Sequence, residues 1–172
     1  MPRSFAELDA QEALHVAIFI EERNAEIYHR FASMFTEFGD VESQAIAGVF
    51  WEMAEEERRH SSMLQSRYCQ QYGNASCSLT EEDLVDFIEV PRLESGDVFA
   101  DSRPGASERN RALQVALTAE VSAQRFYGDL AQCSEPGPLR LIYEELAQTE
   151  GEHVAFLRAK LSGDDAGKPS VP

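Results

Sequence analysis

Glu57 and His60 stand three residues apart in a segment that reads as a long helix, so both side chains would lie on one helix face. The apolar residues of this segment recur at helical spacing, at Ile46, Phe50, Met53 and Leu64. Glu57 and His60 fall on that apolar stripe, where a buried Leu is expected. Because an unpaired buried carboxylate is costly and a metal ion is its strongest partner, the pair predicts a metal-ligating position.

A single Glu-x-x-His pair is weak evidence, since it occurs often by chance in a Glu-rich helix. The pattern occurs twice, however. Residues 146–157 repeat the frame of residues 53–64, [Met/Leu]-Ala-x-x-Glu-x-x-His-x-x-x-Leu, and place Glu150 and His153 at the same positions. These two residues again fall on an apolar stripe, formed by Leu139, Tyr143, Leu146 and Leu157.

Two further helical segments each carry one acid on an otherwise apolar stripe. Residues 16–32 and 115–131 share Val-Ala-x-x-x-Glu, followed seven residues after the Glu by Tyr and eleven residues after it by Ala. The acids are Glu21 and Glu120. With the Glu-x-x-His segments, the chain is two copies of one helical hairpin, and such internal repetition is far less frequent by chance than any single motif.

The elements that position these residues can be delimited from capping and turn signals. Asp9 and Glu12 predict a capping box, and Gly39 with Asp40 predicts the turn of a first hairpin over residues 9–73. Residues 74–106 read as a long crossover containing a short helix from Thr80 to Ile88. A second hairpin is expected over 107–163, broken at 134–138, followed by a mobile polar tail over 164–172. We therefore predict an all-α, single-domain four-helix bundle over residues 1–172.

The positions of the candidate ligands in the sequence predict that they lie at the same height along the axis of each hairpin. Residues of an antiparallel hairpin face each other when the turn lies midway between them. Glu21 and Glu57 have their midpoint at residue 39, (21 + 57)/2, which is Gly39. Glu120 and Glu150 have theirs at residue 135, (120 + 150)/2, inside the second turn. Four Glu and two His are thus expected to converge at mid-bundle, as in carboxylate-bridged di-metal four-helix bundles.

This pattern resembles the ferritin-like superfamily, and most closely its rubrerythrin-like branch, over about residues 9–73 and 107–163. The resemblance implies two iron ions bridged by Glu57 and Glu150, with Glu21 and Glu120 as terminal carboxylates. His60 and His153 would supply one imidazole to each iron. Four carboxylates and two imidazoles suit two ferrous ions and leave coordination positions open, although manganese or another divalent metal also fits such ligands.

Tyr28 and Tyr127 lie two helical turns beyond the acids Glu21 and Glu120. The resemblance suggests that they hydrogen-bond the ligands or transfer electrons, and core packing is the alternative. Other acids and histidines fall off the apolar stripes and are expected to be solvated: Glu22, Glu55, Glu56, Glu152, His15 and His29.

Two departures from the rubrerythrin pattern limit the chemistry that the resemblance implies. The chain has three cysteines, so it cannot form the four-cysteine rubredoxin iron site. Re-reduction would need an external donor, such as a rubredoxin, or further Fe²⁺. Rubrerythrins also carry an extra acid three residues from a ligand in the third helix, where this chain has Leu117 and Ala123. A peroxidase cycle that switches ligands is therefore not expected.

Three functions remain open at the level of sequence. The first is a di-iron oxidoreductase in which two Fe(II) reduce O₂ or H₂O₂, as a ferroxidase or peroxidase. The second is an iron-storage or iron-delivery subunit of a cage or shell, which would hold far more iron per chain. The third is a metal-free helical interaction module, which leaves four buried acids unexplained.

Composition restricts partners and location. The net charge of −16 argues against binding to nucleic acid, which requires clustered Lys and Arg. No apolar run approaches the roughly 20 residues of a membrane span, and the N-terminal residues lack a signal-peptide profile, so we expect a cytoplasmic protein. A homo-oligomer, namely a dimer, is expected, and the long crossover would permit exchange of a hairpin between chains.

Overall fold

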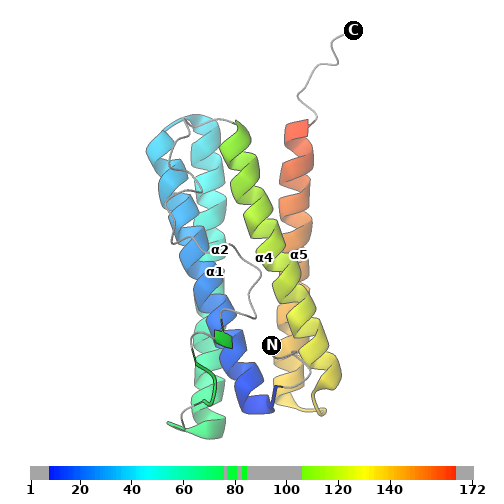
Figure 1. Cartoon of the computed structure of the whole chain (residues 1–172). Coiled ribbons are helices and arrows are strands. Elements are labelled where there is room, and N and C mark those ends of the chain that lie inside the picture. The colour runs from blue at the N-terminus through cyan, green and yellow to red at the C-terminus, as the bar shows by residue number, and fades with distance from the viewer. Residues whose placement is uncertain (1–7, 76, 81–82, 85–105, 166–172) are drawn as a thin grey trace. The chain divides into compact units, whose positions relative to one another are not determined.

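The computed structural model describes residues 8–75, 77–80, 83–84 and 106–165. These residues contain four long helices and no strand (Figure 1). The helices are α1 (Ala10–Phe38), α2 (Val41–Tyr72), α4 (Ala106–Cys133) and α5 (Pro138–Asp165). The predicted all-α fold of two helical hairpins is confirmed.

Helix α1 begins with the predicted capping box. The Asp9 carboxylate accepts hydrogen bonds from the backbone N–H groups of Gln11 and Glu12, and the Glu12 carboxylate accepts one from the backbone of Asp9. These bonds satisfy N–H groups that have no partner within the helix. The helix ends at Gly39, whose φ of 74° lies in the left-handed region that glycine adopts without strain.

The turn between α1 and α2 consists of Gly39 and Asp40 alone. The Asp40 side chain accepts hydrogen bonds from the backbone N–H and the hydroxyl of Ser43, so it caps α2 as predicted. Such a short connection forces α1 and α2 to pack as antiparallel neighbours. The end of α2 falls at Gly73, also as predicted.

Helices α4 and α5 are joined by residues 134–137. Pro138 is the first residue of α5, a position where its missing N–H costs no helical hydrogen bond. Helix α5 continues to Asp165, two residues beyond the predicted end of the hairpin at 163. The tail predicted for 164–172 lies outside the described residues from 166 onward.

The helices divide into two compact units, each built on one hairpin. One unit holds α1 and α2, and the other holds α5 together with α4 up to Ala131. In the first unit, Phe50 packs against Tyr28, Phe31 and Phe35, with ring centroids 5.2–6.1 Å apart. In the second unit, Tyr127 lies between Phe126 and Tyr143, at 5.3 and 6.3 Å. Aromatic pairs thus pack within the core of each hairpin.

The start of the predicted short helix in the crossover is described. The backbone N–H and hydroxyl of Thr80 donate to the Asp83 carboxylate, and the Asp83 N–H donates to the Thr80 hydroxyl. This reciprocal capping opens the short helix at Thr80, where the sequence predicted its start. The rest of the short helix, residues 85–88, and the crossover as far as residue 105 lie outside the described residues.

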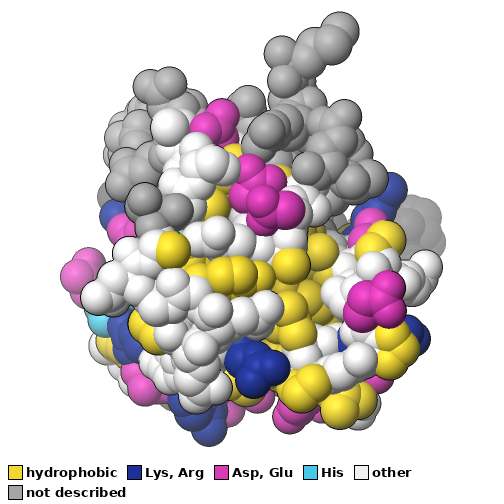
Figure 2. Space-filling model, turned by 90° about the horizontal axis from the view of Figure 1, so that it is seen from below, with side chains coloured by type: hydrophobic (Ala, Val, Ile, Leu, Met, Phe, Trp, Pro, Cys, Tyr) yellow, Lys and Arg dark blue, Asp and Glu magenta, His cyan; other side chains and the backbone are white. Residues whose placement is uncertain are grey.

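On the face drawn in Figure 2, Lys and Arg are scattered single side chains among acidic and hydrophobic ones.

None of the described helices combines the length and the apolar character that a membrane span requires.

Candidate metal centre

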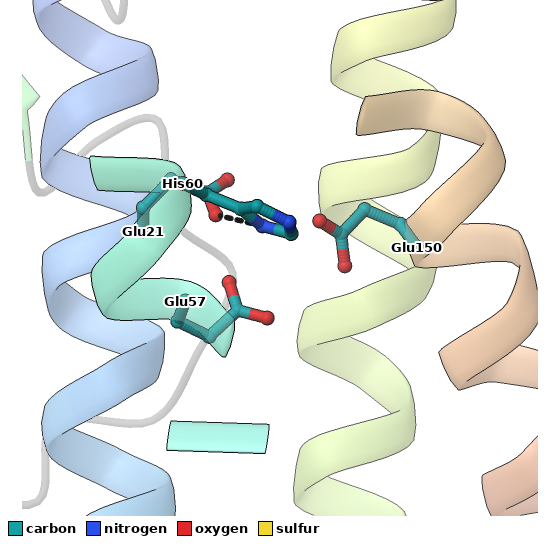
Figure 3. Close-up of side chains that lie close together, drawn as sticks. All are labelled: Glu21, Glu57, His60 and Glu150. Carbon is teal, nitrogen blue, oxygen red and sulfur yellow. Dashed lines mark hydrogen bonds and ion pairs between the residues drawn. The ribbon is translucent and has the colours of Figure 1, made fainter. Parts of the chain in front are cut away.

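Two helices of the first hairpin bring together Glu21, Glu57 and His60. The Glu21 and Glu57 side chains are completely buried, and the His60 side chain is 14% exposed. His60 Nδ1 lies 3.0 Å from Glu21 Oε2, and Figure 3 shows the three side chains with this interaction dashed. Each of the three offers one ligand atom within 4.8 Å of the others. We call these residues the first triad.

The second hairpin brings together the equivalent residues, Glu120 from α4 with Glu150 and His153 from α5. Both acids are completely buried, and the His153 side chain is 12% exposed. His153 Nδ1 lies 3.3 Å from Glu120 Oε2 and 3.2 Å from Glu150 Oε2. Their ligand atoms also lie within 4.8 Å of one another. We call these residues the second triad.

The local reason for both triads is the same. Each Glu-x-x-His pair lies on one face of its helix, and the single Glu of the preceding helix lies opposite because the turn is midway between the two acids. In both triads the histidine presents Nδ1 to the carboxylates. The six predicted ligands are thus brought together in threes, within each hairpin.

Electrostatics in the second triad favour a cation. Burial alone would lower the pKa of His153. Hydrogen bonds and charge interactions with Glu120 and Glu150 outweigh burial and raise the pKa from the ordinary 6.5 to about 11. A protonated imidazole therefore balances the two buried carboxylates in the metal-free protein. Its positive charge stands where a divalent cation would be stabilised by the same groups.

The donor atoms of each triad fit a transition metal. Two carboxylates and one neutral imidazole form an oxygen- and nitrogen-rich set, of the kind that suits iron or manganese. Burial of both acids excludes the water that would otherwise solvate their charge. Three protein ligands also leave a bound ion with open coordination positions.

Tyr28 and Tyr127 are both completely buried. Tyr28 stacks on Phe50, and Tyr127 stacks on Tyr143. These contacts account for core packing, which was one of the two interpretations of the tyrosines. A role in hydrogen bonding to the ligands or in electron transfer stays a prediction.

The residues expected to be solvated lie away from the fully buried positions. Glu22, Glu55 and Glu152 are exposed, and Glu56, His15 and His29 are half-buried. Several have other partners: Glu22 accepts a hydrogen bond from Gln65, Glu55 pairs with Arg58, and His29 packs edge-on against Trp51.

Sequence reasoning missed one buried polar residue beside the first triad. Asn24, three residues after Glu21 on α1, is only 2% exposed. Its position on the apolar stripe was a usable signal, because Asn is seldom buried without a partner.

Comparison with known proteins supports the predicted resemblance. The Rubrerythrin family model matches residues 12–94, which include all of α2, nearly all of α1 and the whole first triad. A hypothetical protein from Pyrococcus furiosus has a similar structure, with a TM-score of 0.71 and 23% sequence identity over 91% of this chain and 90% of that one. At this identity the likeness shows the fold alone. No curated protein matched the sequence.

The predicted resemblance to the ferritin-like superfamily, in its rubrerythrin-like branch, is confirmed over residues 12–94. The second hairpin, with Glu120, Glu150 and His153, lies beyond the matched region. For that half, the evidence is the repeat of the ligand pattern and the geometry of the second triad.

Proposed function

We propose that the two triads form one centre that binds two iron ions and reduces O₂ or H₂O₂, as a ferroxidase or peroxidase. Glu57 and Glu150 would bridge the ions, and Glu21 and Glu120 would be terminal ligands. His60 and His153 would each ligate one ion. The observation that carries this proposal is the occurrence of the same buried Glu–Glu–His triad in both hairpins, one of them in a rubrerythrin-type region.

The resident ions would supply one electron each, which permits a two-electron reduction of the oxidant. The residues of the chain have three tasks around them. The four carboxylates offset the charge of two divalent ions, so that neither charge is buried alone. Burial of those carboxylates keeps bulk water away from the reaction. The contacts of Nδ1 with Glu21 and Glu120 fix the orientation of the two imidazole rings.

Metal binding at the second triad would displace a proton. The raised pKa of His153 favours its protonated form when no metal is present, and Nδ1 can ligate a metal only after losing its proton. We therefore expect metal affinity to rise with pH. The buried acids would then accept the charge of the metal in place of the imidazolium.

We further propose that electrons for re-reduction come from an external donor, such as a rubredoxin, or from additional Fe²⁺. Manganese remains an alternative metal for the same ligands. A cytoplasmic homodimer is the assembly and location that we propose. Iron storage or delivery is the alternative function, and iron content separates the two.

The proposal is tested by metal analysis of protein purified without chelator, followed by anaerobic loading with Fe²⁺. We expect about two iron ions per chain and rapid oxidation of the ferrous form on stopped-flow mixing with O₂ or H₂O₂. Glu55→Ala and Glu152→Ala, which alter exposed acids beside the triads, serve as controls and should behave as the wild type. Absence of bound metal contradicts the proposal, and retention of many more ions per chain favours storage.

A further inference from the structure

Asn24 is a buried amide whose nitrogen has no hydrogen-bond partner in the part of the chain that the structure describes. Its side chain is 2% exposed, so water does not substitute for the missing partner. An amide NH₂ carries two donors, and leaving them unmet in a core lowers stability. An alanine or leucine at this position would avoid that cost, so the buried amide suggests a role other than packing.

The position of Asn24 relates it to the first triad. Asn24 follows Glu21 by three residues on α1, so the two buried side chains are neighbours on one helix face. With Gly39 as the midpoint, Asn24 lies opposite Ala54, (24 + 54)/2 = 39, and His60 lies opposite Ile18, (18 + 60)/2 = 39. Along the axis of the hairpin, Asn24 therefore lies on the turn side of Glu21 and Glu57, and His60 lies on the side away from the turn.

On the Asn24 side of the triad, the facing residue of α2 is small. His60 supplies its ligand atom from one end, while the opposite end has the small side chain of Ala54, which is completely buried. A metal held by Glu21, Glu57 and His60 would have open coordination positions. A small acceptor bound there would meet the unpartnered amide.

The second hairpin lacks this feature. Ala123 occupies the equivalent position, three residues after Glu120, and is 1% exposed. A methyl group donates no hydrogen bond. Any help that the amide gives to a bound ligand is therefore confined to the first triad.

We propose that Asn24 donates a hydrogen bond to a small anion or to water bound at the metal position of the first triad, and so makes this position the one that accepts an exogenous ligand. The inference rests on the proposed function, namely that the first triad binds a metal. Asn24 acts as a positioning residue for that ligand, whose chemical class is a small hydrogen-bond acceptor such as an oxidant or a hydroxide.

The test uses the full chain loaded with Co²⁺ and titrated with azide, followed by visible absorption. Asn24→Leu keeps the approximate size of the side chain and removes both donors. We expect its azide affinity to fall about tenfold, the effect of one hydrogen bond to a charged acceptor, while Co²⁺ stoichiometry is unchanged. The melting temperature of the metal-free variant should be equal to or above that of the wild type, whereas loss of a purely structural amide would lower it.

Asn110→Leu is the matched control. Asn110 lies on α4 ten residues before Glu120, 120 − 110, or about 15 Å along the helix, and its buried side-chain oxygen likewise has no partner among the described residues. This variant should bind azide as the wild type does. Should Asn24→Leu fail to fold by circular dichroism, Asn24→Ala replaces it, with the same expectation.

The outcomes separate this inference from the proposed function. Equal azide affinity of the Co²⁺-loaded wild type and Asn24→Leu would overturn the role of Asn24 and leave the metal centre intact. Loss of one Co²⁺ in Asn24→Leu would also overturn it, because the amide oxygen would then be a ligand. Failure of the wild type to bind Co²⁺ would instead refute the metal centre itself.

Discussion

The two hairpins carry the same ligand triad in different surroundings. Beside the first triad, α1 has Asn24, and α2 has Phe50 and Ser61. At the equivalent positions, the second hairpin has Ala123, Tyr143 and Val154, all at most 4% exposed. The ligands are therefore identical in the two hairpins, whereas some of the residues around them differ. We infer that the two triads can bind the same metal but differ in the contacts that they offer to a further ligand bound to that metal.

Both histidines face the acids of their triads. His153 Nδ1 lies within 3.3 Å of both Glu120 and Glu150, and His60 Nδ1 lies 3.0 Å from Glu21, the acid of the other helix. Variants that alter one triad at a time can show whether the two triads bind metal equally.

The largest effect is expected from the proposed bridging acids. Glu57→Gln or Glu150→Gln should each weaken binding of both metals and slow iron oxidation by more than about 100-fold, the upper end of the effect of losing residues that merely support ligands. Iron content and stopped-flow oxidation rates measure this. If one variant retains both metals and the wild-type rate, that acid does not bridge.

A smaller effect is expected from the histidines, which would each serve a single ion. His60→Ala and His153→Ala should each lower the iron content from about two ions per chain to about one. His29→Ala, which alters a half-buried histidine packed against Trp51, is the control and should retain both ions. Loss of both ions in either ligand variant would show that the two positions fill only together.

The pH dependence of stability tests the second triad in the absence of metal. Because the folded-state pKa of His153 is raised from 6.5 to about 11, its stabilising contribution is complete below about pH 6.5 and disappears as the pH rises through 11. Between these values the metal-free wild type should lose up to about 1.4 kcal/mol per pH unit relative to His153→Gln.

Urea unfolding of both proteins at several pH values measures this difference. Parallel stability curves for the wild type and His153→Gln would show that the second triad does not hold a proton.

The smallest effects are expected at helical glycines. Gly48→Ala in α2 and Gly128→Ala in α4 place the new Cβ in open space and should each stabilise the protein by about 0.5–1 kcal/mol. Gly151→Ala would place its Cβ 2.6 Å from Gln124 Nε2, so Gln124 must move and the gain should be smaller. Thermal unfolding measures these effects, and Gln124→Ala should restore the gain in the Gly151→Ala protein. A full gain in Gly151→Ala alone would show that Gln124 moves freely.

Much of the fold could be predicted because its determinants are local. Asp9 with Glu12, Gly39 with Asp40, and Gly73 mark helix ends through their own side chains or backbone, and all were found at the predicted places. The end of α5 was placed too early, because Ser162–Asp165 has a composition typical of loops but continues the helix. Helix ends without a strong cap are set by small energy differences.

The ligand triads could be predicted because acids on an apolar stripe contradict its periodicity. Asn24 was missed, since an uncharged polar side chain interrupts an apolar stripe less clearly than an acid does, and Asn is an uncommon metal ligand. The stacking of Tyr28 on Phe50 and of Tyr127 on Tyr143 also could not be predicted. The turn midpoints place these residues opposite each other, but stacking of the rings depends on side-chain rotamers, which one sequence does not specify.

The two-residue turn at Gly39 and Asp40 has a consequence for biosynthesis. All three members of the first triad precede Gly73, and only this short connection separates the helices that carry them. Closing so small a loop costs little entropy, so the hairpin can form early. A nascent chain emerging from the ribosome can thus assemble three ligands before the second hairpin has been translated.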